Sequence, residues 1–395
     1  MKKAHVFSLS GAMNTSFYWL AFLFVVINAL FLAKYSMRVS SFWPLVVFAY
    51  IVLQYIVIRK VLPVFEGKST FAGGGGKIVK SGAVAAILLM LAIQLYIDPF
   101  SVNVDRWSAL HYPVSFLLDG EYPYSAPTHL GGRASPFPVW QVLHIPFYIC
   151  NNVGLSLFVT VALFVWSVKR AYSGSAAWKS LVLVVASVCF WYEAAVRSDL
   201  MANMLLLASL ILFVKPYLSL QWIERYYIPV SIAVGLLAST RLLVLLPLAI
   251  LLFPYYVQMK SYRKVIMPVV AVSVFALTFL PIVLLDWNEF FYGQYPPWLL
   301  QSRQGSPVDF LIYIPLIIWF SLSWRKSFGR YCFLTTVYLV VFVGVAFVHR
   351  MVASDNFDLF GSSYDMTYLS VSLPFAIIGM ASATTGEAEG DDRVE

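Results

Sequence analysis

Residues 228–256 of the chain read IPVSIAVGLLASTRLLVLLPLAILLFPYY, an apolar run interrupted near its middle by Ser239-Thr240-Arg241. One membrane-spanning helix needs roughly 20 apolar residues, and this run is longer. An arginine in the middle of a single span would lie in hydrocarbon at a high energetic cost. We therefore predict two short helices that meet at Arg241.

The remainder of the chain is apolar enough to belong in a membrane. Hydrophobic residues make up 61% of the 395 residues and charged residues 12%, and the mean hydropathy is +0.79. So little charge cannot cover a water-soluble globule. We predict an all-α fold, a polytopic transmembrane helical bundle of about twelve spans. The other predicted spans are 17–33, 42–58, 82–97, 153–168, 180–195, 200–214, 265–285, 310–323, 331–348 and 368–383.

The positions of the basic residues predict how the bundle is oriented. Basic clusters occur at Lys2-Lys3, 59–80, 169–179, 260–264 and 325–330. Cytoplasmic connections are enriched in lysine and arginine, so this pattern predicts cytoplasmic N- and C-termini in a multi-pass cell-membrane protein. A single span over 228–256 would place the 260–264 cluster on the opposite face. The net charge of +8 therefore reflects topology, and we predict no nucleic-acid partner.

We divide the chain into three regions. Residues 1–80 hold two N-terminal transmembrane helices and a basic cytoplasmic loop, and residues 81–385 form the main transmembrane domain. Residues 386–395 are an acidic tail that we expect to be disordered. In the predicted orientation the long connection 98–152 lies outside, and its segment 138–150 has the composition of a helix at the membrane surface.

The connection 98–152 carries an unusual group of polar residues. It contains Asp105-Arg106-Trp107 and then Asp119-Gly120-Glu121-Tyr122-Pro123-Tyr124 within an otherwise apolar sequence. An acidic residue after an early span, followed in the same loop by a glycine and a Pro-Tyr pair, resembles the first outer loop of the GT-C superfamily. These are integral-membrane glycosyltransferases that use lipid-linked sugar donors. The resemblance implies that residues 81–385 are a GT-C-like catalytic domain.

This resemblance implies a mannosyltransferase-like hexosyltransferase. Its donor would be a polyprenyl-phosphate sugar, and its acceptor a lipid or glycan on the outer membrane face. Sugar transfer to a hydroxyl needs a general base within hydrogen-bond reach, and Asp105 is the candidate. Asp98 is the alternative base, although its place before Pro99 is typical of a turn. The structural alternative for Asp105 is that it pairs with Arg106 or caps a helix.

A phosphate-linked donor also needs cations, because negative charge grows on the leaving phosphate as the glycosidic bond breaks. Arg197, Arg241 and Arg350 each fall at the outer end of a predicted span, and we predict that they bind this phosphate. Arg241 precedes Leu245-Leu246-Pro247 and resembles a basic residue that GT-C proteins often carry between two short helices. The alternative for each arginine is contact with lipid headgroups.

Further residues of the same face are predicted to contact the substrates: Arg106, Glu121, Tyr124, Asp199 and Asn203. The alternative is an internal ion pair of Arg197 with Glu193 or Asp199 that tightens a helical hairpin. No cofactor is predicted with certainty, and a divalent metal ion is left open. The chain's three cysteines, Cys150, Cys189 and Cys332, have apolar surroundings and are expected to be buried thiols.

Two other function classes fit an apolar chain of this kind. A transporter or flippase of a glycan-lipid substrate would place ionisable residues on broken helices near the membrane midplane. A glycan polymerase or ligase would share the outer loops and arginines without the Asp105 to Tyr124 motif. In all three classes, membrane lipids surround the protein.

Overall fold

The computed structural model describes residues 15–65, 75–298, 306–324, 327–361 and 364–383. Within these ranges the chain is helical, and the only extended pairing is an isolated bridge between Pro127 and Arg133. The all-α prediction is confirmed. The predicted acidic tail at 386–395 lies outside the described residues.

Seven helices of the described chain are long and apolar enough to cross a membrane. These are α1 (Thr15–Ser36), α2 and its continuation (Trp43–Phe65), α3 (Gly75–Tyr96), α9 and its continuation (Leu200–Tyr217), α13 with α14 (Ser261–Leu285), α18 (Phe328–Ser354), and η8 with α19 (Met366–Ala383). A bent pair, α7 (Gly174–Ala186) and α8 (Val188–Ala195), would make an eighth. Shorter helices in the bundle are α6 (Leu155–Ala171), α11 (Tyr227–Ala238), α12 (Leu245–Tyr256) and α17 (Phe310–Ser323).

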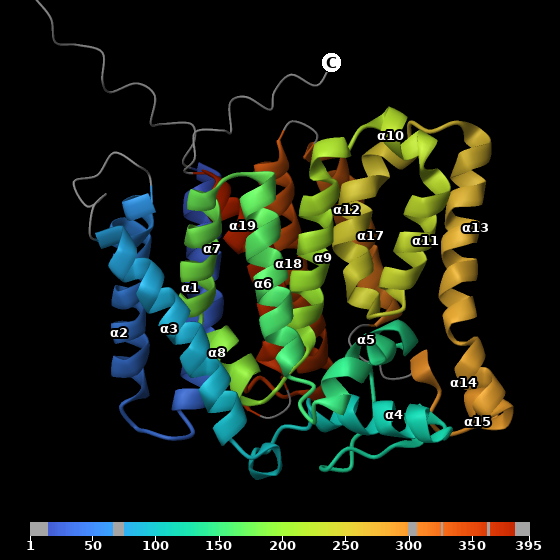
Figure 1. Ribbon diagram of the computed structural model, residues 1–395, viewed down its shortest axis with the longest axis horizontal. Coiled ribbons are helices and arrows are strands. Elements are labelled where there is room, and N and C mark those ends of the chain that lie inside the picture. The colour runs from blue at the N-terminus through green and yellow to red at the C-terminus, as the bar shows by residue number, and fades with distance from the viewer. Residues whose placement is uncertain (1–14, 66–74, 299–305, 325–326, 362–363, 384–395) are drawn as a thin grey trace, which may run out of the picture.

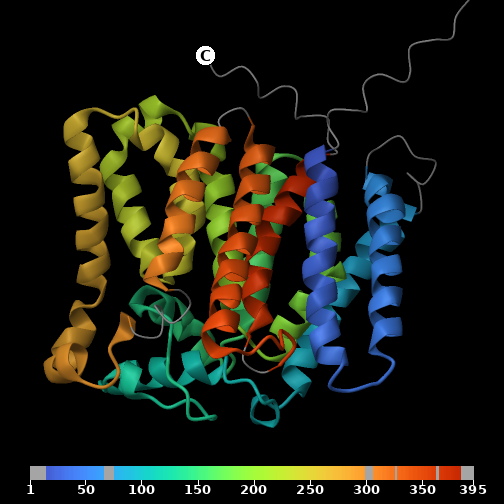
Figure 2. The same cartoon turned by 180° about the vertical axis from the view of Figure 1, so that it is seen from behind.

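The helices pack around α19, whose residues Leu373 to Ser382 are all buried. Helices α1, α7, α9 and α18 lie against it. By contrast, α2, α3 and α13 at the two sides of the bundle expose most of their apolar side chains (Figures 1 and 2). Such exposure is expected where a helix faces lipid, because hydrocarbon chains are as apolar as the side chains they contact.

Residues 228–256 form two helices, as predicted. Helix α11 ends at Ala238, a short 3₁₀ turn follows at Leu242–Val244, and α12 then returns to the end of the bundle from which α11 came (Figure 1). Arg241 is buried at the junction. The carbonyls of Ser239 and Thr240, which the break leaves without helical partners, accept hydrogen bonds from the Val139 and Phe137 amides at the start of α5. The break is therefore closed by a segment about a hundred residues earlier in the chain.

The predicted single span at 180–195 is wrong in one respect, because it is bent by 68° at Ser187 between α7 and α8. Asn28 of α1 occupies the break, where its Oδ1 accepts from Ser187 Oγ at 2.7 Å and from the Cys189 amide at 3.2 Å. On the other side, Gln54 Nε2 donates to the Ala186 carbonyl at 2.7 Å. Polar side chains of neighbouring helices thus satisfy the backbone groups that the bend frees.

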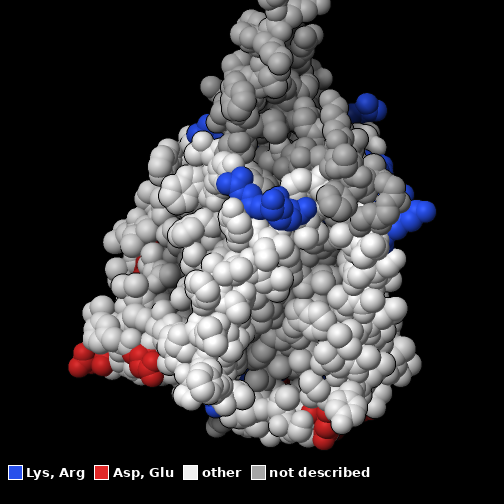
Figure 3. Space-filling view, turned by 90° about the vertical axis from the view of Figure 1, so that its left-hand side faces the viewer, with Lys and Arg blue, Asp and Glu red and all other residues white. Residues whose placement is uncertain are grey.

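The connection between α3 and α6 gathers at one end of the bundle. It contains α4 (Ser108–Asp119) and α5 (Pro138–Ile149), and the α1–α2 turn lies at the same end (Figure 1). The start of α1 and the end of α19 lie at the opposite end. In Figure 3 most basic side chains lie toward that opposite end and most acidic ones toward the end with α4.

Candidate functional site

Aromatic packing holds the α3–α6 connection together. Trp107 Nε1 donates to the Pro99 carbonyl at 3.0 Å, and its ring contacts those of Phe100 and His129. His129 Nδ1 lies 2.7 Å from Ser108 Oγ. Gly120 ends α4 with φ of 77°, a left-handed conformation that glycine adopts without strain, so the turn predicted at Asp119-Gly120 is present.

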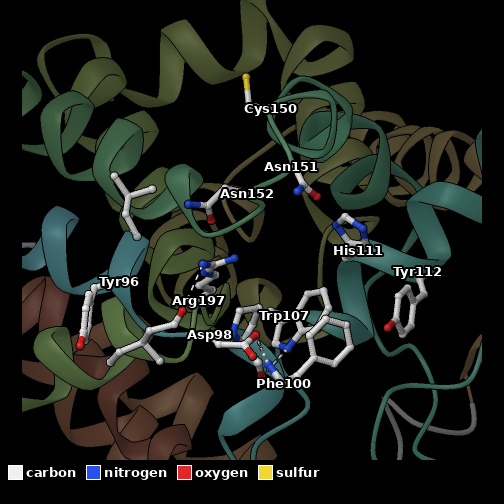
Figure 4. Close-up of a pocket in the computed structure, with 13 residues that line it drawn as sticks. Tyr96, Asp98, Phe100, Trp107, His111, Tyr112, Cys150, Asn151, Asn152 and Arg197 are labelled. Atoms are coloured by element: carbon white, nitrogen blue, oxygen red, sulfur yellow. Dashed lines mark hydrogen bonds between the residues drawn. The ribbon is translucent and has the colours of Figure 1, made fainter.

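A pocket of about 630 Å³ opens beside this packed loop (Figure 4). Small-molecule sites commonly have volumes of about 300 to 1,000 Å³. Four parts of the chain line it: the end of α3 with the turn after it, one face of α4, the α5–α6 link, and Arg197 between α8 and α9. The lining residues are Leu95, Tyr96, Ile97, Asp98, Pro99, Phe100, Trp107, His111, Tyr112, Cys150, Asn151, Asn152 and Arg197.

The two candidate bases lie in different surroundings. Asp98 is exposed and lines the pocket, and its carboxylate accepts from the Phe100 amide at 3.0 Å in the turn expected before Pro99. Asp105 is half-buried and does not line this pocket. Its Oδ2 accepts from Thr128 Oγ1 at 2.9 Å, and the Gly132 backbone packs closely against it.

Arg106 does not pair with Asp105. It forms an ion pair with Asp365 just before η8, donates to Thr367 Oγ1 at 3.3 Å, and lies over the Tyr368 ring at 5.2 Å from its centroid. The structure therefore joins the start of α4 to the last membrane helix. The sequence does not predict this role of Asp365, because its only local signal is one acidic residue before the final apolar segment.

Arg241 and Asp199 form a buried ion pair. Arg241 Nη2 donates to Asp199 Oδ1 at 2.8 Å and to Oδ2 at 2.6 Å, and Trp140 Nε1 donates to Oδ2 at 2.6 Å. Burial alone would raise the pKa of Asp199, but the guanidinium and the indole N–H outweigh it and lower the pKa. Asn203 lies one turn into α9, where its backbone N–H donates to the backbone carbonyl of Asp199. The structure thus brings the side chains of two predicted residues together, Asp199 and Arg241.

Arg197 makes neither of the ion pairs considered for it. Its Nη2 donates to the carbonyls of Gln94 at 3.0 Å and Ile97 at 3.3 Å, and its backbone has φ of 52°. Burial lowers the pKa of Arg197, while Asp98 opposes this effect. Arginine is a cation at any physiological pH, so a charged guanidinium lines the pocket.

The remaining predicted residues lie away from the pocket lining. Arg350 is exposed near the end of α18, and Glu121 is exposed after α4. Tyr124 is buried, and its hydroxyl donates to the Pro136 carbonyl at 3.2 Å. The buried thiols predicted at Cys189 and Cys332 are confirmed, but Cys150 is exposed because it ends α5 at the surface.

The described side chains do not form an obvious metal centre. No group of three His, Cys, Asp or Glu residues in the described ranges lies close enough together to hold a metal ion.

No protein-family model, curated protein or solved structure matches this chain.

Proposed function

We propose that the chain is a membrane glycosyltransferase of the GT-C type. It would transfer a hexose from a polyprenyl-phosphate donor to a lipid or glycan acceptor at the membrane face that carries the α3–α6 connection. The proposal includes about twelve crossings, cytoplasmic termini and an outer location for the connection 98–152.

One observation carries this proposal: the loop marked by the Asp105 to Tyr124 motif packs beside a pocket of about 630 Å³ that is lined by the Asp98 carboxylate and the Arg197 guanidinium. Glycosyl transfer from a phosphate donor needs a cation to stabilise the leaving phosphate, a role for Arg197 here. It also needs a carboxylate to accept the proton of the attacking hydroxyl, and the candidates are Asp98 in the pocket and Asp105 in the adjoining loop. Aromatic rings on the pocket wall, from Phe100 and Trp107, suit contact with a sugar.

Asp105 remains the proposed base, with Asp98 as its rival. Thr128 Oγ1 and the Gly132 backbone fix the orientation of the Asp105 carboxylate, as a base requires, whereas Asp98 has direct access to the pocket. Arg197, Arg241 and Arg350 are the proposed phosphate ligands. Arg106, Glu121, Tyr124, Asp199 and Asn203 are proposed to shape the acceptor and donor sites.

The test is transfer by the purified chain in liposomes. We expect product with a polyprenyl-phosphate sugar and none with a soluble sugar nucleotide. Asp105→Asn keeps the shape of the side chain but removes its basicity, and should lower transfer about 10²-fold or more. Asp98→Asn should be milder. Full activity of Asp105→Asn together with loss in Asp98→Asn would transfer the role of base to Asp98.

A transporter or flippase is the second candidate, and the buried Asp199–Arg241 pair favours it. This pair lies where α9 begins and where α11 and α12 meet, beside the bent pair α7–α8. Transporters place charged groups at such breaks. Passage of an unmodified glycan-lipid across liposomes, without formation of a new covalent product, would favour this candidate. A polymerase or ligase would instead lengthen a glycan already attached to lipid.

A further inference from the structure

The arginines near the α4 end of the bundle are not equivalent. The charge of Arg241 is paired by Asp199, and that of Arg106 by Asp365. Among the lining residues, all of which lie in the described ranges, Arg197 is the one lysine or arginine. An incoming anion in this pocket would therefore meet the Arg197 guanidinium first.

The Arg197 guanidinium is held in place, but not all of its N–H groups have a hydrogen-bond partner within the described chain. Its Nη2 donates to two carbonyls at the end of α3, whereas its Nη1 makes no hydrogen bond within the described chain. Its Nε is buried and also has no partner there. Gln94 Nε2, also buried and without a partner there, lies on the same wall, since a Cβ on Gly154 would touch both side chains. Figure 4 shows Arg197 beside Asn152 and above Asp98. A left-handed backbone at a residue other than glycine costs energy and is often retained where function requires it.

The rim of the pocket is apolar. Leu95, Tyr96 and Phe100 line the pocket and yet are 62%, 92% and 61% exposed. They continue the exposed apolar surface of α3, which includes Leu88 and Leu89. Aromatic residues at the end of a span are typical of the membrane–water interface. The pocket therefore opens along a surface that faces lipid.

We infer that this pocket binds the phosphate of a long-chain lipid. The phosphate would lie at Arg197, and the lipid tail would leave the pocket over Leu95, Tyr96 and Phe100 and continue along α3. The inference rests on the proposed function for the choice of a polyprenyl phosphate, and it assigns the donor's phosphate to one of three arginines. Guanidinium and phosphate match in charge and in the geometry of their hydrogen bonds.

The charge of Asp98 should have the opposite effect on phosphate binding to that of Arg197. Its carboxylate lies on the same pocket wall and acts electrostatically on Arg197, although the two form no ion pair. The negative charge of Asp98 would repel a bound phosphate. Removal of the Asp98 charge should therefore strengthen phosphate binding, whereas removal of the Arg197 charge should weaken it.

The experiment is equilibrium binding of a radiolabelled polyprenyl phosphate, without sugar, to the full chain in detergent micelles. We expect saturable binding, weakened on the order of tenfold or more in Arg197→Gln, weakened less in Arg197→Lys, and strengthened in Asp98→Asn. Arg38→Gln is the matched control. Arg38 is exposed in the α1–α2 turn at the same end of the bundle. Its replacement removes the same charge outside the pocket, so the affinity of this variant for polyprenyl phosphate should be unchanged.

Competitors distinguish the sources of the phosphate. Excess inorganic phosphate and excess polyprenol should each fail to displace the lipid. Displacement by inorganic phosphate alone would show a site for a free anion and overturn the lipid assignment. Equal affinity of wild type and Arg197→Gln, or weaker binding in Asp98→Asn, would overturn the role of Arg197, and Asp98→Asn remains informative if Arg197→Gln fails to fold. Because no sugar is transferred, intact binding by a chain without transferase activity would refute the proposed function and leave this inference standing.

Discussion

Arg241 and Asp199 are joined by three hydrogen bonds of 2.6, 2.8 and 3.2 Å in the interior of the bundle. Their side chains are only 6% and 4% exposed. The pair connects the junction of α11 and α12 to the start of α9, and Trp140 of α5 adds a further hydrogen bond to the same carboxylate. Three separate parts of the chain therefore depend on one buried charge pair.

Loss of one member of this pair should destabilise the fold strongly. Arg241→Met leaves a buried carboxylate without its counter-ion, at a cost of about 3 to 5 kcal/mol. We expect a clear fall in the Tm of the purified protein in detergent. The double variant Asp199→Leu with Arg241→Met should recover much of that loss, because no charge is left buried. An unchanged Tm in Arg241→Met would show that the pair does not stabilise the bundle.

Gly132→Ala should impair transfer without removing any charge. A Cβ at this position would lie 2.5 Å from Asp105 Oδ2 and 3.0 Å from Thr128 Oγ1, so the Asp105 carboxylate must move. Misplacement of a catalytic group by about 1 Å can cost about 10²-fold in rate. Gly174→Ala, which has nothing within 4 Å, is the control. If Gly132→Ala retains full activity while Asp105→Asn is inactive, positioning by Gly132 is unimportant.

His144 should make stability depend on pH. Burial lowers the pKa of His144 to about 4 from an ordinary value of 6.5, although Asp199 opposes the shift. Between these values the unfolded chain binds a proton that the folded chain does not, so stability falls as the pH drops from 6.5 to 4. The loss attributable to His144 is about 3 kcal/mol by this shift.

The measurement is Tm against pH for the wild type and His144→Gln. Glutamine retains a donor for the Trp140 carbonyl, which His144 Nδ1 contacts at 2.8 Å, but does not titrate. The wild type should lose more stability than the variant between pH 6.5 and 4. Parallel curves for the two proteins would be evidence against a buried neutral imidazole.

Cysteine labelling tests the proposed orientation. Exposed Cys150 lies after α5 at the α4 end, whereas exposed Lys169 lies near the other end of α6. In intact cells we expect a membrane-impermeant maleimide to label Cys150. With Cys150→Ser and Lys169→Cys combined, labelling should require permeabilised cells. The reverse pattern would invert the topology and place the candidate site on the cytoplasmic face.

Much of the helical layout could be predicted from the sequence, because helix formation in a membrane is a local requirement. Every backbone donor and acceptor in hydrocarbon must be satisfied within its own helix, so apolar runs mark helices directly. The break at Ser239-Thr240-Arg241, the helix over 138–150 and the turn at Asp119-Gly120 follow from such local signals. The bend at Ser187 does not, because its stabilising partners are Asn28 and Gln54 of other helices.

The pairing of charges was decided by tertiary structure alone. The sequence placed Arg106 beside Asp105 and Arg197 near Asp199, yet Arg106 pairs with Asp365 and Asp199 pairs with Arg241. A buried charge must find a counter-ion wherever helix packing brings one, irrespective of its distance along the chain. Composition likewise identified a polar loop between apolar segments. Only the packing of α3, α4 and the α5–α6 link against Arg197 creates a pocket there, because Arg197 lies far from these segments in the sequence.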